Sequence, residues 1–281
     1  MDDQHPSRTA WRVAVSRAAH QVVDSPRVFD DPLAVRILGP DGHAALERDR
    51  ADATNRVASA LRAFMAVRSR IAEDSLADAY AHGVRQYGVL GAGLDTFAYR
   101  NDLAGLRVFE VDHPATQQWK RGLIEQAAVP IPRSLTYVPV DFERRGFVEA
   151  LANGGFDCTA PAFFSWLGVT MYLNRETVVE TVRAIAALPR PSAVVFDYAV
   201  APAKLGMMER AVLAAFERRV AAIGEPWTCY FEPGDLAAVL GTAGFVRVQD
   251  LGPEAINRSY FDGRSDGLRV GSLAHVMLAA H

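Results

Sequence analysis

Two patterns are missing from the sequence: a cysteine framework and a long apolar run. The only cysteines among the 281 residues, Cys158 and Cys229, follow neither a C-x-x-C nor a Cys/His metal spacing, so we expect two idle thiols and no metal site. No apolar run reaches the roughly 18 residues of a membrane-spanning helix, and residues 1–7 are polar, without the apolar core of a signal peptide. Membrane insertion and secretion are therefore disfavoured, and we expect a cytoplasmic protein.

Long blocks of one charge sign are missing too. Lys and Arg number 30 against 33 Asp and Glu, which gives a formal net charge of −3 at pH 7. A surface for nucleic acid or an anionic membrane needs concentrated positive charge, so we expect neither partner and predict a small-molecule ligand instead. What the chain does have is hydrophobic residues, which make up 50% of it. This composition and length are typical of a globular α/β domain with a large core.

The chain is organised around residues 87–100, which read Y-G-V-L-G-A-G-L-D-T-F-A-Y-R. The apolar run at 89–90 predicts a buried parallel strand, and Gly91, Ala92 and Gly93 predict a turn whose backbone N–H groups can face a ligand. The pattern G-x-G-x-x-G of phosphate-binding turns is incomplete, because Thr96 stands where the third glycine would be. This departure favours an uncharged adenosine ligand over NAD.

Acidic residues end the next two predicted strands. Residues 106–112 carry Asp112 about 20 residues after the glycine turn, where nucleoside binders place a carboxylate for the ribose hydroxyls. Residues 137–142 end in Asp141 and Phe142, a carboxylate and a ring that suit the exocyclic amine and the faces of adenine. The alternative for Asp141 is that it caps the following helix.

Residues 55–82 predict a long helix that Gly83 ends, with Arg68 near the middle of its apolar stripe. Burying an unpaired guanidinium costs several kcal/mol. Arg68 must therefore meet an internal carboxylate or reach into a ligand pocket, and the residues alone leave both alternatives open.

The second half of the chain predicts further strands and an insertion. A fourth strand at 162–167 continues into 168–173, so Leu167 and Tyr172 should line the reaction site at the carboxyl end of the sheet. Tyr198 ends a fifth strand that begins at residue 193 and is expected in the substrate pocket, and 272–279 predict a last, antiparallel strand. The lid segment, residues 202–233, is too long for a simple crossover and carries Trp227 as an aromatic residue that can face the substrate. Near the N-terminus, residues 29–34 predict a short helix region that Gly39-Pro40 closes.

Four motifs occur in order between residues 89 and 173. The glycine turn G-A-G-L-D-T-F-A-Y-R is followed by E-V-D-H-P-A-T-Q-Q-W-K-R, Y-V-P-V-D-F and W-L-G-V-T-M-Y-L. Together they resemble the leucine carboxyl methyltransferase family, and most of all its branch of bacterial S-adenosylmethionine-dependent O-methyltransferases, often linked to polyketide tailoring. The resemblance implies a class I, Rossmann-like α/β fold with a seven-stranded, mostly parallel sheet and helices on both faces. It divides the chain into an N-terminal helical cap, residues 1–83, and a methyltransferase core, residues 84–281, that carries the lid segment.

The resemblance also implies a cofactor and its contacts. The cofactor would be S-adenosyl-L-methionine, with its methionine carboxylate held by Arg68, in an R-[ST] pair, and with Asp112 as a cofactor-binding acid. Leu167 departs from part of the family, which has glutamate there. The departure removes a polar contact to the cofactor's amino group, which a backbone carbonyl would have to replace.

The expected reaction is O-methylation of a carboxylate or hydroxyl of a small molecule, such as a polyketide or another secondary metabolite. Methyl transfer from a sulfonium disperses charge, so it depends on alignment and exclusion of water more than on acid-base groups. A hydroxyl acceptor would need a base, for which Tyr172, Tyr198 and His275 are candidates. The alternatives are methylation of a protein C-terminal carboxylate and a nucleoside-binding protein without turnover. We expect a monomer or homodimer.

Overall fold

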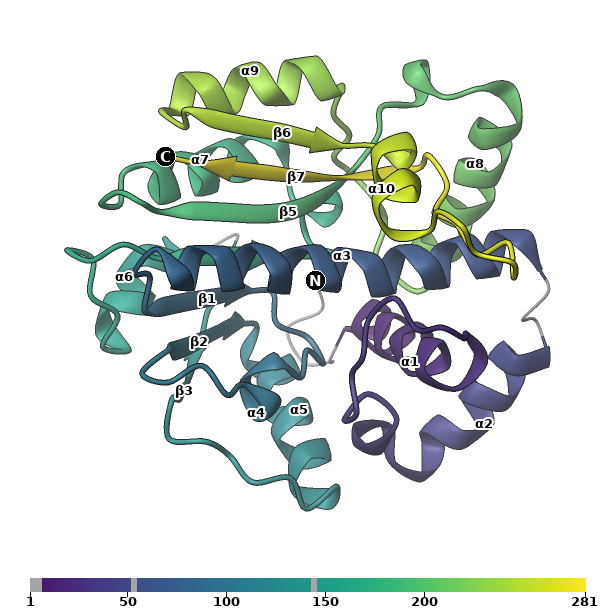
Figure 1. The fold of residues 1–281 in the computed structure, drawn as a ribbon, viewed down its shortest axis with the longest axis horizontal. Coiled ribbons are helices and arrows are strands. Elements are labelled where there is room, and N and C mark those ends of the chain that lie inside the picture. The colour runs from purple at the N-terminus through teal and green to yellow at the C-terminus, as the bar shows by residue number, and fades with distance from the viewer. Residues whose placement is uncertain (1–6, 52–54, 143–145) are drawn as a thin grey trace.

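A mixed sheet forms the centre of the structure, a computed structural model that describes residues 7–51, 55–142 and 146–281. Its seven strands lie in the order β3-β2-β1-β4-β5-β7-β6 (Figure 1). Strands β1 to β5 pair in parallel, whereas β7 is antiparallel to both β5 and β6. The predicted sheet and its antiparallel last strand are thus confirmed. The strands are β1 (Gln86–Leu90), β2 (Arg107–Asp112), β3 (Leu135–Pro139), β4 (Phe163–Trp166), β5 (Ala193–Ala199), β6 (Arg247–Leu251) and β7 (Ala274–Ala280).

The strand order reverses between β1 and β4. The chain adds β2 and β3 on one side of β1, then returns to add β4 and β5 on the other. In open α/β sheets, ligands bind at such a switch point, outside the carboxyl ends of the strands. The fold therefore points to the ends of β1, β2 and β4 as the site.

Helices cover both faces of the sheet, with α3 and α10 on one face and α6, α7 and α9 on the other (Figure 1). A sheet covered in this way buries whole strands, and every residue of β1, β4 and β5 is buried. The α-helices are α1 (Arg8–Val23), α2 (Gly39–Ala51), α3 (Arg56–Ala81), α4 (Phe97–Arg100), α5 (Pro114–Gln126), α6 (Phe147–Asn153), α7 (Arg175–Ala186), α8 (Met207–Ala221), α9 (Pro233–Ala243) and α10 (Pro253–Tyr260). Three short 3-10 helices, η1 (Arg36–Leu38), η2 (Thr170–Tyr172) and η3 (Pro202–Lys204), complete the set in the described ranges.

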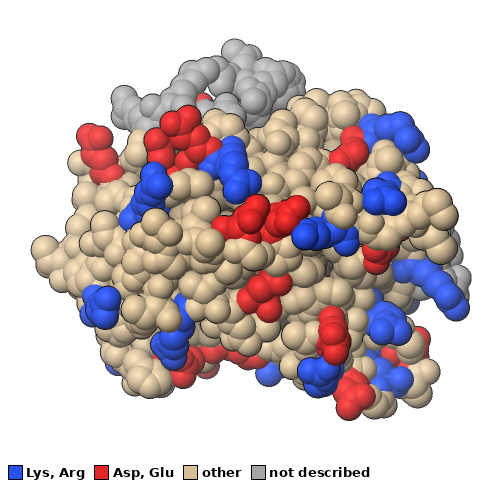
Figure 2. Space-filling model, turned by 90° about the horizontal axis from the view of Figure 1, so that it is seen from above, with Lys and Arg blue, Asp and Glu red and all other residues tan. Residues whose placement is uncertain are grey.

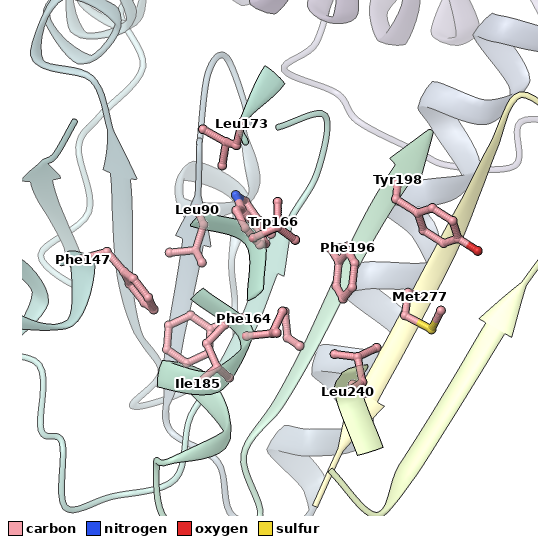
Figure 3. Packing of buried hydrophobic residues seen from close by; sticks show 14 of the residues in the cluster. Leu90, Phe147, Phe164, Trp166, Leu173, Ile185, Phe196, Tyr198, Leu240 and Met277 are labelled. Atoms are coloured by element: carbon pink, nitrogen blue, oxygen red, sulfur yellow. The ribbon is translucent and has the colours of Figure 1, made fainter. Parts of the chain in front are cut away.

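Aromatic side chains fill the layer between the sheet and α6, α7 and α9 (Figure 3). Phe164, Trp166 and Phe196 are fully buried there, together with Ile185 from α7 and Leu240 from α9. A core packed this densely holds the ends of β4 and β5 rigidly. The loops that follow these strands therefore start from fixed positions.

Side-chain caps fix the starts of two N-terminal helices. Ser7 Oγ accepts a hydrogen bond from the N–H of Ala10 at the start of α1, and Asn55 Oδ1 accepts from the N–H groups of Val57 and Ala58 at the start of α3. The start at Asn55 agrees with the helix predicted over residues 55–82. The polar segment before Ser7, which bears on secretion, lies outside the described residues.

Two local predictions are wrong. Residues 29–34 form a bend and a turn instead of a helix; the short helix that Gly39 closes is η1, and Gly39-Pro40 also begins α2. Because the first helical turn does not need the missing proline N–H, Gly-Pro is compatible with a helix start. The fourth strand ends at Trp166 and does not continue through residues 168–173 as predicted. Gly168 turns the chain with φ of 76°, and Thr170–Tyr172 form η2.

Charges of both signs are interspersed over the face shown in Figure 2. Among the helices that the structure describes, none combines the length and the apolar character that crossing a bilayer requires. Cys158 and Cys229 are free thiols, and no cluster of His, Cys, Asp and Glu in the described ranges could hold a metal ion.

Candidate active site

The glycine turn after β1 lines a cavity of about 310 Å³. The N–H groups of Gly91 and Ala92 donate to Val111 O at 2.7 and 3.2 Å, which ties the turn to the end of β2. Gly91 has φ of 66°, and a Cβ on it would lie 2.3 Å from Val169 Cγ2 on the cavity wall. The turn can therefore keep this shape only with glycine at position 91.

The carboxylate of Asp112 is fixed at the end of β2 by two backbone groups. The N–H of Gly93 donates to Oδ2 at 2.5 Å, and the N–H of His113 donates to Oδ1 at 2.6 Å. Burial raises the pKa of Asp112, and these two N–H groups oppose the increase. Asp112 lines the cavity beside the glycine turn, which is where a ribose-binding carboxylate has to lie.

Glu110, two residues earlier on β2, is buried and does not line the cavity. Its Oε2 accepts a hydrogen bond from Lys120 Nζ at 2.7 Å, and both side chains are 1% exposed. Burial raises the pKa of Glu110 to about 7, although Lys120 opposes the increase. This ion pair lies inside the protein, between β2 and α5.

Asp141 and Phe142 follow β3, which ends at Pro139 rather than at residue 142 as predicted. The N–H of Val140 still donates to Asp112 O at 2.8 Å, so the loop continues beside the end of β2. Asp141 and Phe142 both line the cavity, and the Phe142 ring lies 6.3 Å from the Trp166 ring, centroid to centroid. The structure therefore brings together the two carboxylates and the ring that we predict for ribose and adenine.

Arg68 satisfies both alternatives that its place on α3 left open. Its Nη1 donates to Asp197 Oδ2 at 2.5 Å, with the two side chains 4% and 1% exposed, and the residue also lines the cavity. Asp197 Oδ1 accepts from the N–H of Gly168 at 2.5 Å. The ion pair thus holds the loop after β4, where Leu167 lines the cavity as well. The cofactor contact of Arg68 stays a prediction.

A carboxylate of the lid segment joins that segment to α1. Glu225 Oε1 accepts from the N–H of Arg8 at 2.8 Å, and Oε2 accepts from the N–H of Thr9 at 3.0 Å and the hydroxyl of Ser7 at 3.3 Å. The N–H groups of a first helical turn have no partner within the helix, and the positive end of the helix dipole favours a carboxylate. Ser7, Thr9 and Glu225 all line the cavity. The start of α1 and the loop 224–228 therefore form one side of the cavity together.

Tyr172, predicted for the substrate pocket, lines the cavity from η2. Trp227 lies next to it, with the ring centroids 6.5 Å apart. Trp227 itself does not line the cavity, although Pro226 and Thr228 on either side of it do. Pro226 and Thr228 thus border the cavity directly, whereas Trp227 contacts it only through Tyr172.

Tyr198, also predicted for the substrate pocket, is not brought to the cavity. Its hydroxyl points away from Trp166 (Figure 3) and donates to Asp250 Oδ1 at 2.8 Å. His275 belongs to the same cluster, with Nδ1 2.8 Å from Asp250 Oδ2. Successive side chains of a strand point to opposite faces of the sheet. Asp197 therefore points toward α3 and Arg68, and Tyr198 points to the opposite face.

Sequence reasoning missed Arg17, Asp197 and Glu225. Arg17 is 4% exposed, with Nε 3.0 Å from Asp31 Oδ2, and it lines the cavity because α1 is buried on several sides. The available signal for its burial was a charged residue next to small apolar residues in the same helix. Asp197 and Glu225 had none, because their partners lie 129 and more than 200 residues away in sequence.

The cavity fits a nucleoside with a charged tail. Among the described residues, four carboxylates line it, from Asp95, Asp112, Asp141 and Glu225, against two arginines; Arg68 pairs with Asp197, and Arg17 pairs with Asp31 and, at 3.5 Å, with Asp95. Burial favours protonation of Asp95, yet Arg17, Lys120 and Arg100 keep its pKa below the ordinary value. An excess of negative charge favours a ligand with a net positive charge. S-adenosyl-L-methionine, with a sulfonium and an ammonium against one carboxylate, has that charge.

The strand order, the covering helices and the site define the chain as a Rossmann-like methyltransferase. Its fold is similar to the crystal structure of a candidate methyltransferase from Thermobifida fusca, with a TM-score of 0.59. The likeness covers 99% of this chain and 96% of that one at 18% sequence identity, so it bears on the fold.

Residues 10–186 match the family model described as leucine carboxyl methyltransferase. The chain is 31% identical over 307 aligned positions to YktD of Bacillus subtilis, which is named as a candidate S-adenosyl-L-methionine-dependent methyltransferase, and the match covers 99% of each chain. A Mycobacterium marinum protein with the same kind of name is 36% identical over 191 positions, covering 65% of this chain and 62% of its own. The chain therefore belongs to the leucine carboxyl methyltransferase family, and its cofactor is S-adenosyl-L-methionine.

Proposed function

We propose that the chain transfers the methyl group to an oxygen atom of a small molecule, a carboxylate or hydroxyl of a polyketide or another secondary metabolite. The observation that carries the proposal is the contact of Glu225 with the first turn of α1, which joins the loop 224–228 to α1 at the edge of the cavity. The whole cavity, including the part assigned to the cofactor, has a volume of about 310 Å³, at the lower end of the range of small-molecule sites. A small acceptor therefore fits this site better than a macromolecule.

Different side chains around the cavity bind different parts of the cofactor. When bound, the cofactor supplies a methyl group on a positively charged sulfonium. In this proposal Asp112 and Asp141 bind its nucleoside end and Arg68 binds its carboxylate, which the position of all three residues on the cavity wall supports. The start of α1 and the loop 224–228 shield one side of the cavity from water, and alignment of the two reactants there provides most of the rate enhancement in this proposal.

Two alternatives lead to different results. Methylation of a protein C-terminus requires a cavity open to a macromolecule, which the Glu225 contact disfavours. A nucleoside-binding protein without turnover would keep the cofactor contacts and fail to react. Leu167, where part of the family has glutamate, is the observation that favours this second alternative.

Calorimetric titration with S-adenosyl-L-methionine and S-adenosyl-L-homocysteine, with NAD as the control, tests the cofactor site first. We expect micromolar binding of both nucleosides and none of NAD. Methyl transfer from the radiolabelled cofactor to carboxylate and hydroxyl acceptors then tests the reaction. Binding without transfer to any acceptor would favour the protein without turnover, and absence of binding would refute the proposal.

A further inference from the structure

Asp95, just after the glycine turn, belongs to a charge network that joins this turn to α1, α3 and α4. In the network Arg100 Nη1 donates to Glu73 Oε2 at 2.8 Å, and Arg17 Nε lies 3.0 Å from Asp31 Oδ2. Each arginine thus has a carboxylate of its own. Asp95 has a more distant contact, with its Oδ2 3.5 Å from Arg17 Nη1. Among these five residues there is therefore one carboxylate more than there are arginines.

The carboxylate of Asp95 stays ionised in these surroundings. Burial favours its protonation, yet Arg17, Lys120 and Arg100 keep its pKa below the ordinary value. Lys120 is itself paired with Glu110 at 2.7 Å, so it does not supply the missing positive charge. A partly buried charge without its own counter-charge is unfavourable unless a ligand supplies one.

Asp95 is also the carboxylate of the network that a ligand can reach. It lines the cavity, whereas Asp31 and Glu73 do not, and its side chain is 20% exposed. Its Oδ1 accepts a hydrogen bond from the N–H of Phe97 at 2.8 Å. Within the described ranges no hydrogen bond reaches Oδ2, which leaves this oxygen for a donor in the cavity.

The strand order indicates which end of the cofactor lies beside Asp95. Asp112 and Asp141, which we predict for the nucleoside, follow β2 and β3 on one side of β1. Asp95 follows β1 itself, and the guanidinium of Arg68 packs against Gly168, which follows β4 on the other side. A cofactor that extends across the switch point with its nucleoside over β2 and β3 therefore has its methionine end over β1 and β4.

Other side chains near that end cannot bind an ammonium group as well. Leu167 and Val169, which line the cavity after β4, are apolar. Asp197 is already bound by an arginine and a backbone N–H, and Glu225 accepts three hydrogen bonds from the start of α1. Asp95 is thus the carboxylate of the described lining that best suits a cation there.

We propose that Asp95 binds the ammonium group of S-adenosyl-L-methionine and supplies its counter-charge, next to the carboxylate contact proposed for Arg68. The assignment concerns the cofactor and not the acceptor. It therefore goes beyond the proposed function and does not depend on which oxygen atom is methylated.

Analogues of S-adenosyl-L-homocysteine that lack one charged group test the assignment. Carboxypropylthioadenosine lacks the amino group, and aminopropylthioadenosine lacks the carboxyl group. Calorimetry at neutral pH gives the dissociation constants of the parent nucleoside and both analogues for the wild type, Asp95→Asn and Asp95→Ser. Both substitutions keep an oxygen for the N–H of Phe97. Glu73→Gln is the matched control, because it removes a carboxylate of the same network that does not line the cavity. Thermal unfolding checks the fold of every variant.

In the wild type we expect the analogue without the amino group to bind about tenfold more weakly than S-adenosyl-L-homocysteine. Both Asp95 variants should weaken binding of S-adenosyl-L-homocysteine and aminopropylthioadenosine about tenfold or more, the loss of a hydrogen bond between charged groups. Binding of carboxypropylthioadenosine should change by less than about twofold, because it has no ammonium group to lose. Glu73→Gln should not discriminate among the three ligands.

Three results would overturn the assignment. Equal weakening of all three ligands in the Asp95 variants would show that Asp95 only shapes the glycine turn. Unchanged binding of S-adenosyl-L-homocysteine would exclude the contact, and the same selective loss in Glu73→Gln would assign the effect to the network as a whole. A wild type that does not bind S-adenosyl-L-homocysteine would refute the proposed function as well.

Discussion

Arg68 pairs with Asp197 inside the protein and also borders the cavity, so its removal has two separable consequences. Arg68→Ala should weaken binding of S-adenosyl-L-homocysteine by about 2 kcal/mol, the value of a charged hydrogen bond. It should also lower the free energy of unfolding by about 3 kcal/mol, because Asp197 is left buried without its cation. Calorimetry and urea unfolding measure the two effects.

The double variant Arg68→Ala/Asp197→Asn separates stability from binding. Removing the uncompensated charge should restore most of the free energy of unfolding while leaving the affinity low. If the folded single variant binds the nucleoside as well as the wild type does, Arg68 is a structural residue only.

Gly91 combines backbone and packing requirements in one position. Gly91→Ala should lower the free energy of unfolding by about 3 kcal/mol, since a left-handed conformation and a contact with Val169 are both unfavourable. Gly83→Ala is the control, because Gly83 has φ of 94° and no atom within 4 Å of an added Cβ. It should cost about 1 kcal/mol. Adding Val169→Ala to Gly91→Ala should restore part of the lost free energy of unfolding. If Gly91→Ala and Gly83→Ala lowered the free energy of unfolding equally, the contact with Val169 would contribute nothing.

At the level of elements, the contact between α1 and the lid segment depends on one carboxylate. Glu225→Gln removes the charge that faces the first turn of α1, an effect of about 1 kcal/mol. The amides of Arg8 and Thr9 should then exchange hydrogen about fivefold faster, and S-adenosyl-L-homocysteine should dissociate faster. Exchange mass spectrometry and stopped-flow measurements follow the two rates. Glu180→Gln, at an exposed position of α7, serves as the control and should leave both unchanged.

Elements with a local signal were predicted well. The start of α3 lies where the helix over residues 55–82 was predicted, and the end of β1 follows from the glycine turn. Where the signal is ambiguous, the prediction was incomplete: Gly39 ends η1 as predicted for the end of a helix, and with Pro40 it also starts α2. The predicted continuation of β4 through residue 173 was wrong because Gly168 has a positive φ, which ends the strand. Gly168 packs against Arg68 and donates its N–H to Asp197, and these distant partners cannot be read from the local sequence.

For the whole molecule, the Glu110–Lys120 pair links stability to pH. The pKa of Glu110 is about 7 in the folded protein, above its ordinary value of 4.5. Between these values the folded state holds a proton that the unfolded chain has lost, so the free energy of unfolding falls as the pH rises. From pH 5 to pH 8 the wild type should lose about 2 to 3 kcal/mol relative to Glu110→Gln/Lys120→Met, in which neither group titrates.

Urea unfolding of both proteins across this range measures the difference. A gap between the two proteins that does not change with pH would show that Glu110 ionises in the folded state as it does in the unfolded chain.

The site was predicted on its cofactor side and less so on its acceptor side. Strand ends converge at one edge of an α/β sheet, so Gly91, Asp112 and Asp141 could be placed together from their positions in sequence. Partners that depend on how distant segments pack, such as Asp197 for Arg68 and the first turn of α1 for Glu225, left no pattern in the sequence. Tyr198 was expected at the cavity because it ends a strand, but the alternation of side chains on β5 directs it to the other face.

The position of β7 has a consequence for how the chain is made. Of the seven strands β7 is synthesised last, yet it lies between β5 and β6. While the ribosome adds residues 200–273, one edge of β5 has no partner and β6 has no strand to join. Unpaired edges are sites of aggregation. A nascent chain that stalls before residue 274 therefore exposes two such edges, and the sheet closes only when β7 has left the ribosome.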